Sequence, residues 1–287
     1  MNPNINSEIE VTVVCMSFNQ EDYIEQCLKS LVSQRTNFKY EIIVHDDAST
    51  DTTAMKIKRF AQSHPDIVLL LQNENQYSQG KNIRKLIMPY IHGRYISLCE
   101  GDDWWCDVNK LQIQYDLMQS DQSIAACAHA VRLFSEERQK FNGALAPRST
   151  KCEITTDEII REIAPFGTNS LFFKTQYYLM PDEYMGWVVG DYPLCIWLSI
   201  NGKFVYLPDM MSVYRMNAKG SWSERMKRAD YAIHQNMMII DGLLRFNAAT
   251  DEKYSEAVQS AILDYRISNC VLEQDIKGLL ANDCRSR

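Results

Sequence analysis

Glycine is missing from the chain before Gly80, so the N-terminal part has no glycine-rich loop of the kind that cradles phosphates. The sequence also lacks any Cys-x-x-Cys pair and any apolar run near the roughly 20 residues that a membrane-spanning helix needs. Basic residues are outnumbered, with 30 Lys and Arg against 37 Asp and Glu, and the formal net charge is −7. No broad basic face is therefore available for nucleic acid, and any phosphate contact must be local.

The rest of the composition is that of an ordinary soluble protein. With 287 residues and 46% hydrophobic content, the chain can bury a large core as one big domain or two. Its nine cysteines form an odd set, and several lie within apolar patterns, which predicts reduced, buried thiols in the cytosol. The start, Met1 to Asn4, has no basic or apolar signal region, so we expect a cytoplasmic chain that is neither secreted nor integral to a membrane.

Apolar strand patterns alternate with helical patterns in the first third of the chain. Strands are predicted at 11–15, 41–45, 67–71 and 95–99. Three helices are predicted between them: one that begins after Asn19 as its N-cap, one at 52–62 and one at 83–87. This alternation predicts a mostly parallel, doubly wound sheet, in which ligands collect outside the carboxyl ends of the strands. Polar residues follow three of the strands, at 17–19, 46–47 and 100–103, and we expect them to converge on one crevice.

The segment that follows the fourth strand, Glu100-Gly101-Asp102-Asp103-Trp104-Trp105, is the most informative part of the sequence. Its three carboxylates lie within four positions and repel one another by several kcal/mol at an effective dielectric of about 20. A nearby cation would relieve that repulsion. The sequence therefore predicts a divalent metal that carries a phosphate at the end of this strand.

The pattern beyond Trp105 is mixed rather than strictly alternating. We expect a helix at 108–119, a strand at 124–134, a helix at 156–163, a strand at 170–173, a helix that begins at Asp191, and two long helices from about Arg225. The first of these long helices carries Ile233, Met237, Ile240 and Leu244 at helical spacing on one face. The chain then divides into residues 1–107, residues 108–222 and a helical C-terminal extension, 223–287.

Taken together, these segments resemble the inverting family 2 glycosyltransferases of the GT-A fold, typified by bacterial enzymes that build surface polysaccharides. The resemblance extends over roughly residues 10 to 222. It rests on the order and spacing of segments 13–19, 41–51 and 93–103, followed by Gly190-Asp191 and Tyr214-Arg215. It implies a GT-A fold, in which a Rossmann-like, mostly parallel sheet is flanked by helices, with nucleotide-sugar binding in the first part and acceptor binding in the second.

The resemblance also implies a donor site. Phe18 takes the place of an aromatic side chain that stacks on the nucleotide base, with Asn19 beside it. Asp47 takes the place of an acid that accepts hydrogen bonds from a uracil ring edge, which favours a UDP-sugar. Arg84 matches a basic position that faces the diphosphate, and Lys81 is its neighbour.

Metal and catalytic residues are implied in the same way. Glu100, Asp102 and Asp103 occupy the Asp-x-Asp region, where carboxylates hold Mg²⁺ or Mn²⁺ against the donor phosphates. Because the first acid is glutamate here, Glu100 either reaches the metal through water or bonds the ribose, and direct ligation is expected of Asp102 or Asp103. Asn217 stands where many relatives carry a metal-positioning histidine, and Asp191 matches the base that takes a proton from the acceptor hydroxyl.

Acceptor contacts are expected from Trp104, Trp105, Thr168 and Asn169, although the two tryptophans are equally consistent with core packing. Structural roles also stay open elsewhere: a turn or helix cap for the segment at Asp47, an N-cap for Asp191 and core packing for Phe18. The basic residues at the start of the C-terminal helices, Arg225, Lys227 and Arg228, either meet acidic lipid headgroups or are simply solvated.

Three functional hypotheses follow. The first is a metal-dependent inverting glycosyltransferase that moves a hexose or N-acetylhexosamine from a UDP-sugar to a glycan or lipid-linked acceptor. For such an enzyme, a peripheral location at the inner face of the cytoplasmic membrane is one expectation beside a purely cytoplasmic one. The second is a nucleotidyltransferase that forms nucleotide sugars, which is disfavoured because such enzymes need a glycine-rich, basic phosphate loop near the N-terminus. The third is a catalytically silent module that binds nucleotide sugars or glycans.

Overall fold

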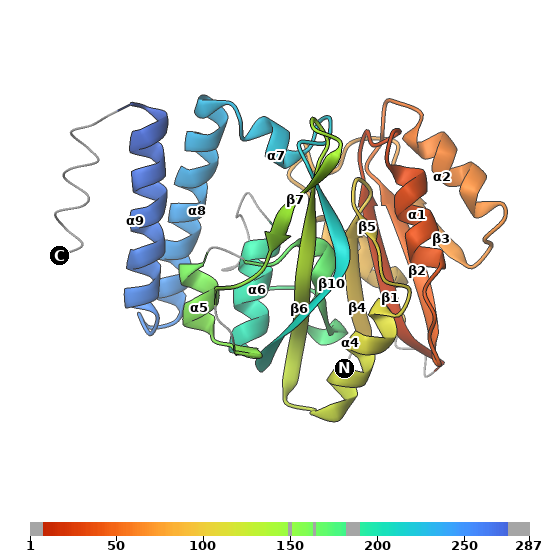
Figure 1. The fold of residues 1–287 in the computed structure, drawn as a ribbon, viewed down its shortest axis with the longest axis horizontal. Helices are drawn as coiled ribbons and strands as arrows, with labels where there is room; N and C mark the ends of the chain where they lie inside the picture. The colour runs from red at the N-terminus through yellow and green to blue at the C-terminus, as the bar shows by residue number, and fades with distance from the viewer. Residues whose placement is uncertain (1–7, 149–150, 163–164, 182–189, 275–287) are drawn as a thin grey trace.

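The structure is a computed structural model and describes residues 8–148, 151–162, 165–181 and 190–274 (Figure 1). Met1 to Asn4, Ile163 at the end of a predicted helix, and Cys284 lie outside the described residues. Of the eight cysteines in the described part of the chain, five are buried, while Cys106 and Cys152 are exposed. Within the described part of the chain, none of the helices is both long enough and apolar enough to cross a membrane.

Four parallel strands form the first half of the sheet, in the order β3-β2-β1-β4. Their bounds are Ile9–Ser17 (β1), Lys39–Asp46 (β2), Ile67–Leu71 (β3) and Tyr95–Glu100 (β4). Each is an apolar run because both faces of a parallel sheet are covered. The register pairs Met16 with Glu100 and Ser17 with Asp46, so the polar residues after these strands meet at one edge. The predicted convergence is confirmed.

The helices of this half agree with the predicted pattern, with one correction. They are α1 (Ile24–Val32), α2 (Thr53–Ala61) and α3 (Ile83–Ile87), and a 3₁₀ turn, η1 (Met88–Tyr90), follows α3. The predicted N-cap role of Asn19 is wrong, because a turn closed on the Gln20 carbonyl comes first and Tyr23 occupies the cap. Asn19 instead adopts a left-handed backbone (φ 52°), and its side chain accepts a hydrogen bond from the Thr50 amide at 2.7 Å.

The second half of the sheet is mixed, as the sequence indicated. β9 (Phe172–Lys174) lies antiparallel between β4 and β6 (Ile124–Ser135), and β10 (Lys203–Met216) runs parallel to β6. Three further strands pair antiparallel to these: β5 (Trp104–Trp105), β7 (Lys140–Leu145) and β8 (Glu153–Ile154). Two 3₁₀ turns flank β9, η2 (Thr168–Ser170) and η3 (Thr175–Tyr177). The α/β fold class is confirmed, and β10 is the long strand that the sequence patterns did not indicate.

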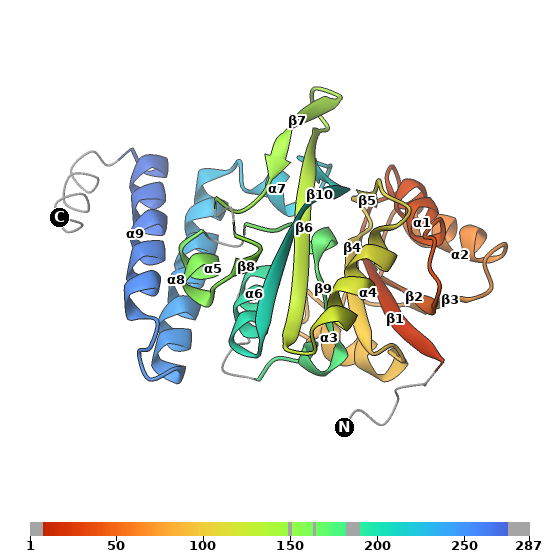
Figure 2. The same ribbon diagram turned by 60° about the horizontal axis from the view of Figure 1, so that its bottom comes forward.

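Helices cover both faces of the sheet (Figures 1 and 2). On one face, α1, α2 and α4 (Lys110–Ser120) pack their apolar residues against β1, β2 and β4. The other face is covered by α3, α5 (Thr156–Arg161) and α6 (Asp191–Ile200). Beyond β10 come α7 (Trp222–Arg225), α8 (Ala229–Ala249) and α9 (Ser255–Leu272), and α9 contacts both α8 and α5.

The apolar face predicted for α8 is only partly correct. Ile240 is buried, but Met237 and Leu244 are 55% and 52% exposed. The helix buries a neighbouring stripe instead, which includes Ile239, Leu243 and Phe246. Two apolar stripes at helical spacing were available in this segment, and only packing against α9 and the body of the protein selects between them.

Candidate active site

The candidate site lies at the carboxyl edge of β1, β2 and β4, where α6 also begins. Segments far apart in the sequence meet there: the loops after the three strands, the η2 turn, the start of α6 and the end of β10. In parallel sheets this is the edge at which ligands bind.

The acid segment concentrates negative charge in a desolvated position. Burial, followed by the charges of Asp102 and Asp191, raises the pKa of Glu100 to about 8. Burial also raises the pKa of Asp102 to about 6. For Asp103, burial and the neighbouring charges of Asp102 and Glu100 raise the pKa well above its usual range. These shifts show that ionising the carboxylates together is unfavourable here unless a cation joins them.

Asp103 is buried, and both of its carboxylate oxygens are hydrogen-bonded within the protein. It is 2% exposed; its Oδ1 accepts a hydrogen bond from the Arg215 backbone N–H (2.8 Å) and its Oδ2 accepts one from the Asn169 side-chain amide (2.7 Å). Both oxygens thus tie the acid segment to β10 and to η2. Of the two acids for which direct metal ligation was predicted, this arrangement favours Asp102.

Two of the side chains predicted to contact an acceptor are inside the core. Trp105 is 4% exposed, and its indole N–H donates to the Asn169 carbonyl oxygen at 3.1 Å. Asn169 is fully buried, and its Oδ1 accepts from the Ser212 hydroxyl at 2.7 Å. This burial favours core packing for Trp105 and a structural role for Asn169, and their contact with an acceptor stays a prediction. Trp104 and Thr168 are half-buried, and their acceptor role stays a prediction.

Arg215 is the residue whose part in this site the sequence reasoning missed. Its side chain is buried, and its Nε–H donates to the Asp102 carbonyl oxygen at 2.8 Å. The Tyr214-Arg215 pair was a recognisable signal in the sequence, but nothing local to it indicates which distant groups the guanidinium meets.

On the opposite side of the site, Asp191 is the first residue of α6 and Gly190 is the N-cap. One oxygen, Oδ1, accepts from the Tyr192 backbone N–H at 2.8 Å, and the other, Oδ2, accepts from the Thr168 hydroxyl at 3.3 Å. Since Asp191 contributes to the raised pKa of Glu100, the two carboxylates act on one another across the site. The predicted base and the predicted metal-binding segment are therefore close together.

Arg84, predicted to face the diphosphate, lies beside the start of α6. Its Nη2 donates to the Gly190 carbonyl oxygen at 2.6 Å, whereas its Nη1 is buried without a hydrogen-bond partner. Burial lowers the pKa of the Arg84 guanidinium, and the nearby charges of Tyr178 and Asp191 oppose that shift. A buried donor without an acceptor is costly, and a phosphate oxygen is the type of group that would satisfy it.

The part of the site predicted to bind the nucleotide contains the exposed ring of Phe18 and a loop that is held by hydrogen bonds to Asp47 and Lys81. Phe18 is 44% exposed, so core packing does not account for it. Asp47 is buried, and its two oxygens accept from the backbone N–H groups of Gln76 and Tyr77 at 2.8 and 3.0 Å. Lys81 holds the same loop, because its ammonium donates to the Gln76 side-chain oxygen at 2.7 Å. These bonds order the loop, and the base contact of Asp47 stays a prediction.

The residues present fit a divalent cation whose remaining ligands are water molecules and donor phosphates. Among the described residues, no group of three or more His, Cys, Asp or Glu side chains is arranged to hold a metal ion. Glu100 and Asp102 nevertheless supply two carboxylates whose shared ionisation a cation would stabilise. Mg²⁺ is commonly held by one or two carboxylates together with water and substrate phosphates. Asn217, another predicted ligand, has a left-handed backbone (φ 60°) and is held through its N–H to Ser223.

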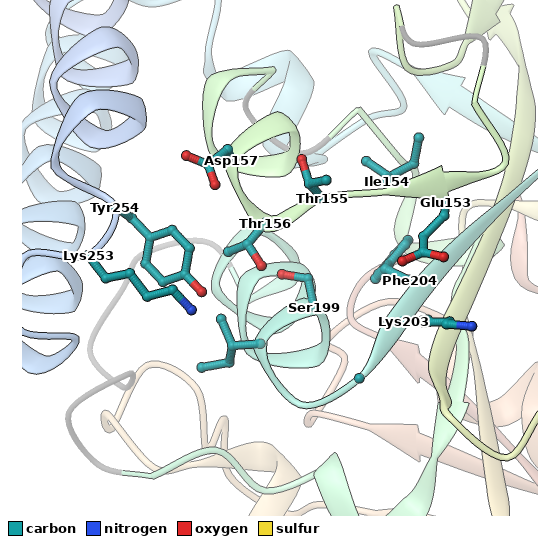
Figure 3. A pocket seen from close by; sticks show the side chains of 12 residues that line it. Glu153, Ile154, Thr155, Thr156, Asp157, Ser199, Lys203, Phe204, Lys253 and Tyr254 are labelled. Carbon is teal, nitrogen blue, oxygen red and sulfur yellow. The ribbon is translucent and has the colours of Figure 1, made fainter.

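A surface pocket of about 410 Å³ lies away from this site (Figure 3). It is lined by β8, the start of α5, the end of α6, the start of β10 and the turn before α9. Phe204 lines it at the beginning of β10, whereas Arg215 contacts the acid segment near the end of that strand. Their partners on β6, Ala126 and Phe134, are eight positions apart, about 26 Å at roughly 3.3 Å per residue, so the pocket is separate from the candidate active site.

The chain is similar to known proteins in sequence and in fold. The chain is 31% identical over 214 residues to Rv1520 of Mycobacterium tuberculosis, a match that covers 74% of this chain and 60% of that protein. It is 34% identical over 109 residues to the Escherichia coli UDP-Glc:alpha-D-GlcNAc-diphosphoundecaprenol beta-1,3-glucosyltransferase WfgD, covering 38% and 40% of the two chains.

In fold, the chain is similar to Staphylococcus aureus TarS solved in complex with UDP-GlcNAc, with a TM-score of 0.70 and 14% identity over 96% of this chain and 79% of that one. Residues 12–178 match the family described as Glycosyl transferase family 2. That match includes β1, β2, β4 and the acid segment, and on this ground the chain belongs to glycosyltransferase family 2.

Proposed function

We propose that this protein is a metal-dependent, inverting glycosyltransferase that moves a hexose or N-acetylhexosamine from a UDP-sugar to a glycan or lipid-linked acceptor. The observation that carries the proposal is the η2 turn, in which the Thr168 hydroxyl donates to the Asp191 carboxylate and the adjacent Asn169 amide donates to the Asp103 carboxylate, so that the predicted base and the acid segment are joined through two neighbouring residues. A donor held by Glu100 and Asp102 would lie next to a carboxylate that can accept a proton.

Each residue then has a defined task. When bound, Mg²⁺ or Mn²⁺ supplies positive charge beside the departing nucleoside diphosphate. Glu100 and Asp102 would hold that ion, and the unpaired Nη1 of Arg84 would donate to a phosphate oxygen. Asp191 accepts the proton of the acceptor hydroxyl as the hydroxyl oxygen bonds to the anomeric carbon and the bond to the diphosphate breaks. A single displacement of this kind inverts the anomeric configuration.

Thr168 orients the base. Its hydroxyl donates to Asp191 Oδ2, while the Tyr192 N–H holds Oδ1, so the carboxylate plane is fixed by two contacts. The hydroxyl contact, at 3.3 Å, is the longer and weaker of the two. Oδ2 is therefore the oxygen that we assign to proton transfer.

The printed names of similar proteins support the donor and acceptor classes. TarS was solved with UDP-GlcNAc, and WfgD is named for a UDP-Glc donor and a diphosphoundecaprenol-linked acceptor. This chain spans 60% of the length of Rv1520 and 40% of the length of WfgD. A UDP-sugar donor and a lipid-linked acceptor are the choices we would test first.

Contact with acidic lipids through the basic residues before α8 belongs to the same proposal, but the structure weakens it. Lys227 pairs with Glu137, and Arg228 pairs with Asp230 at 2.7 Å. Two of the three predicted cations thus have acidic partners of their own. Oligomerisation through α8 and α9 is likewise a proposal, for which the exposed apolar groups include Met237 and Leu244 on α8 and Val271 on α9.

Calorimetric titration of UDP, with and without Mn²⁺, tests the proposal. We expect tight binding only when Mn²⁺ is present, followed by transfer when UDP-sugars and acceptors are screened. Metal-independent binding would remove Glu100 and Asp102 as ligands. Binding without any transfer, and with no effect of D191N, would identify a silent nucleotide-sugar-binding module.

A further inference from the structure

Arg215 contacts several elements beside the candidate donor site. It is 6% exposed and lies near the end of β10. Its Nη1 donates to Glu136 Oε2 at 2.7 Å and its Nη2 donates to Gln26 Oε1 at 2.6 Å. The guanidinium therefore joins the acid segment, through Asp102, to the β6–β7 turn and to α1.

Aromatic rings fix the plane of this guanidinium. Its central carbon lies 4.6 Å from the ring centroid of Tyr23 and 4.6 Å from that of Trp104, and Phe134 is at 5.5 Å. Stacking on aromatic faces, with in-plane hydrogen bonds to separate acceptors, is a geometry that arginine provides and lysine does not. The side chain is thus held rigidly as well as paired in charge.

Arg215 forms two hydrogen bonds to the acid segment. Its Nε–H donates to the carbonyl oxygen of Asp102, and its backbone N–H donates to the carboxylate of Asp103. The peptide unit between the two aspartates is consequently fixed on both sides. The Nε hydrogen bond goes to the main chain of Asp102, while the charge of Arg215 favours the ionised form of the Asp102 carboxylate by lowering its pKa.

We infer that Arg215 is a positioning residue that fixes the main chain of Asp102 and so presents the Asp102 carboxylate to the cation and diphosphate of the donor. The inference rests on the proposed function and extends it to a residue that does not itself touch the donor. A neighbouring group that orients a metal ligand commonly changes metal affinity by 10- to 100-fold when it is removed.

The test compares R215K with F204L, a variant at the opposite end of the same strand. Phe204 is buried, so F204L should lose stability without disturbing the acid segment. Two quantities are measured: hydrogen exchange of the peptide that spans 100–105 without ligand, and UDP affinity in the presence of Mn²⁺. Exchange is informative because the Asp103 N–H donates to the Glu100 carbonyl oxygen at 3.0 Å within this turn.

We expect R215K to accelerate exchange in this peptide and to weaken Mn²⁺-dependent UDP binding by about tenfold or more. In turnover, the KM for the donor should rise more than kcat falls. F204L should change neither local exchange nor affinity. If R215K does not fold, E136Q replaces it, because it removes the ion pair of Arg215 while keeping the contact with Asp102, and we expect a smaller shift in the same direction.

Equal effects of R215K and F204L, or unchanged affinity in R215K, would overturn the inference and leave Arg215 with a role in stability alone. The outcome for the proposed function is separate. If the wild-type protein binds no UDP with Mn²⁺, the proposed function fails and the donor role of Arg215 fails with it, while the exchange data still show whether Arg215 holds the segment.

Discussion

Lys110 places an ammonium group in the core beneath the acid segment, and this has a measurable consequence. The residue is fully buried on α4; its Nζ donates to the Ser97 hydroxyl (2.9 Å) and to Gln114 Oε1 (2.8 Å), and it lies 4.0 Å from the ring centroid of Trp105. Burial lowers the pKa of Lys110 from 10.5 to about 7. The charged form is therefore disfavoured in the folded protein.

The sign of the resulting pH dependence follows from proton uptake. Between pH 7 and pH 10.5 the unfolded chain keeps a proton on Lys110 that the folded chain has largely lost, so folding is favoured as the pH rises. The penalty is fully present below pH 7 and disappears as the pH approaches the unfolded value. At 1.36 kcal/mol per pKa unit, the free energy of unfolding should gain about 2 kcal/mol between pH 7 and pH 9 from this group.

The perturbation is K110M, which keeps a side chain of similar length but cannot titrate. Ser97 and Gln114 lose a donor in this variant, and that cost does not depend on pH. Urea unfolding of both proteins at pH 7, 8 and 9 should show the wild type gaining about 2 kcal/mol relative to K110M. Two parallel profiles would refute the reasoning.

Other titrating groups do not imitate this result. Burial raises the pKa of Cys99 to about 11 and that of Cys127 to about 12, and it lowers the pKa of His129 to about 3. None of these three changes protonation in the folded protein between pH 7 and pH 9, and their unfolded-state titration cancels in the comparison. Glu100, whose pKa is raised to about 8, does titrate in this range, but it does so in both proteins and its contribution also cancels. K203M is the matched control, because Lys203 is exposed and Asp121 raises its pKa.

Three further predictions concern the candidate site. D191N should lower the rate of transfer by about 10²- to 10⁴-fold while calorimetry shows the UDP affinity of the wild type; a normal rate would reject Asp191 as the base. D102N should abolish the gain in UDP affinity that Mn²⁺ provides, without changing the free energy of unfolding. D103N should instead lower the free energy of unfolding by about 1–3 kcal/mol, because the new side-chain NH₂ group would face the Asn169 amide or the Arg215 N–H, which are both donors. F18A should weaken UDP binding by about 1–3 kcal/mol, the range for aromatic stacking on a base, with unfolding unchanged; equal affinity would exclude stacking.

The parallel half of the fold and the gathering of its polar ends could be predicted from sequence. Buried parallel strands are continuous apolar runs, and the residues that follow them must meet at one edge. β10 was not predicted, because Pro208 and Asp209 interrupt its apolar pattern at the point where its register with β6 shifts. The N-cap assigned to Asn19 failed because Asn is favoured equally in left-handed turns and at helix starts, and local sequence does not choose between them.

The sequence suggested which residues form the candidate site, but it predicted their contacts with one another only in part. Asp102 and Asp191 were proposed from the resemblance of their segments to a family pattern, and their roles stay predictions. The burial of Asn169 and Trp105 depends on partners from remote segments, including Ser212 on β10. The role of Arg215 depends in the same way on Gln26, 189 positions away. Contacts of this kind are fixed by tertiary packing and leave no local pattern.

The η2 turn places two adjacent residues against opposite sides of the site. Thr168 donates to the carboxylate of Asp191, and Asn169 donates to that of Asp103. A graft that replaces this loop to alter acceptor choice would therefore also disturb the donor side, even if every acceptor contact were copied correctly. Laboratory evolution of new acceptors should then succeed more often with libraries that leave this dipeptide untouched and diversify the segments around it.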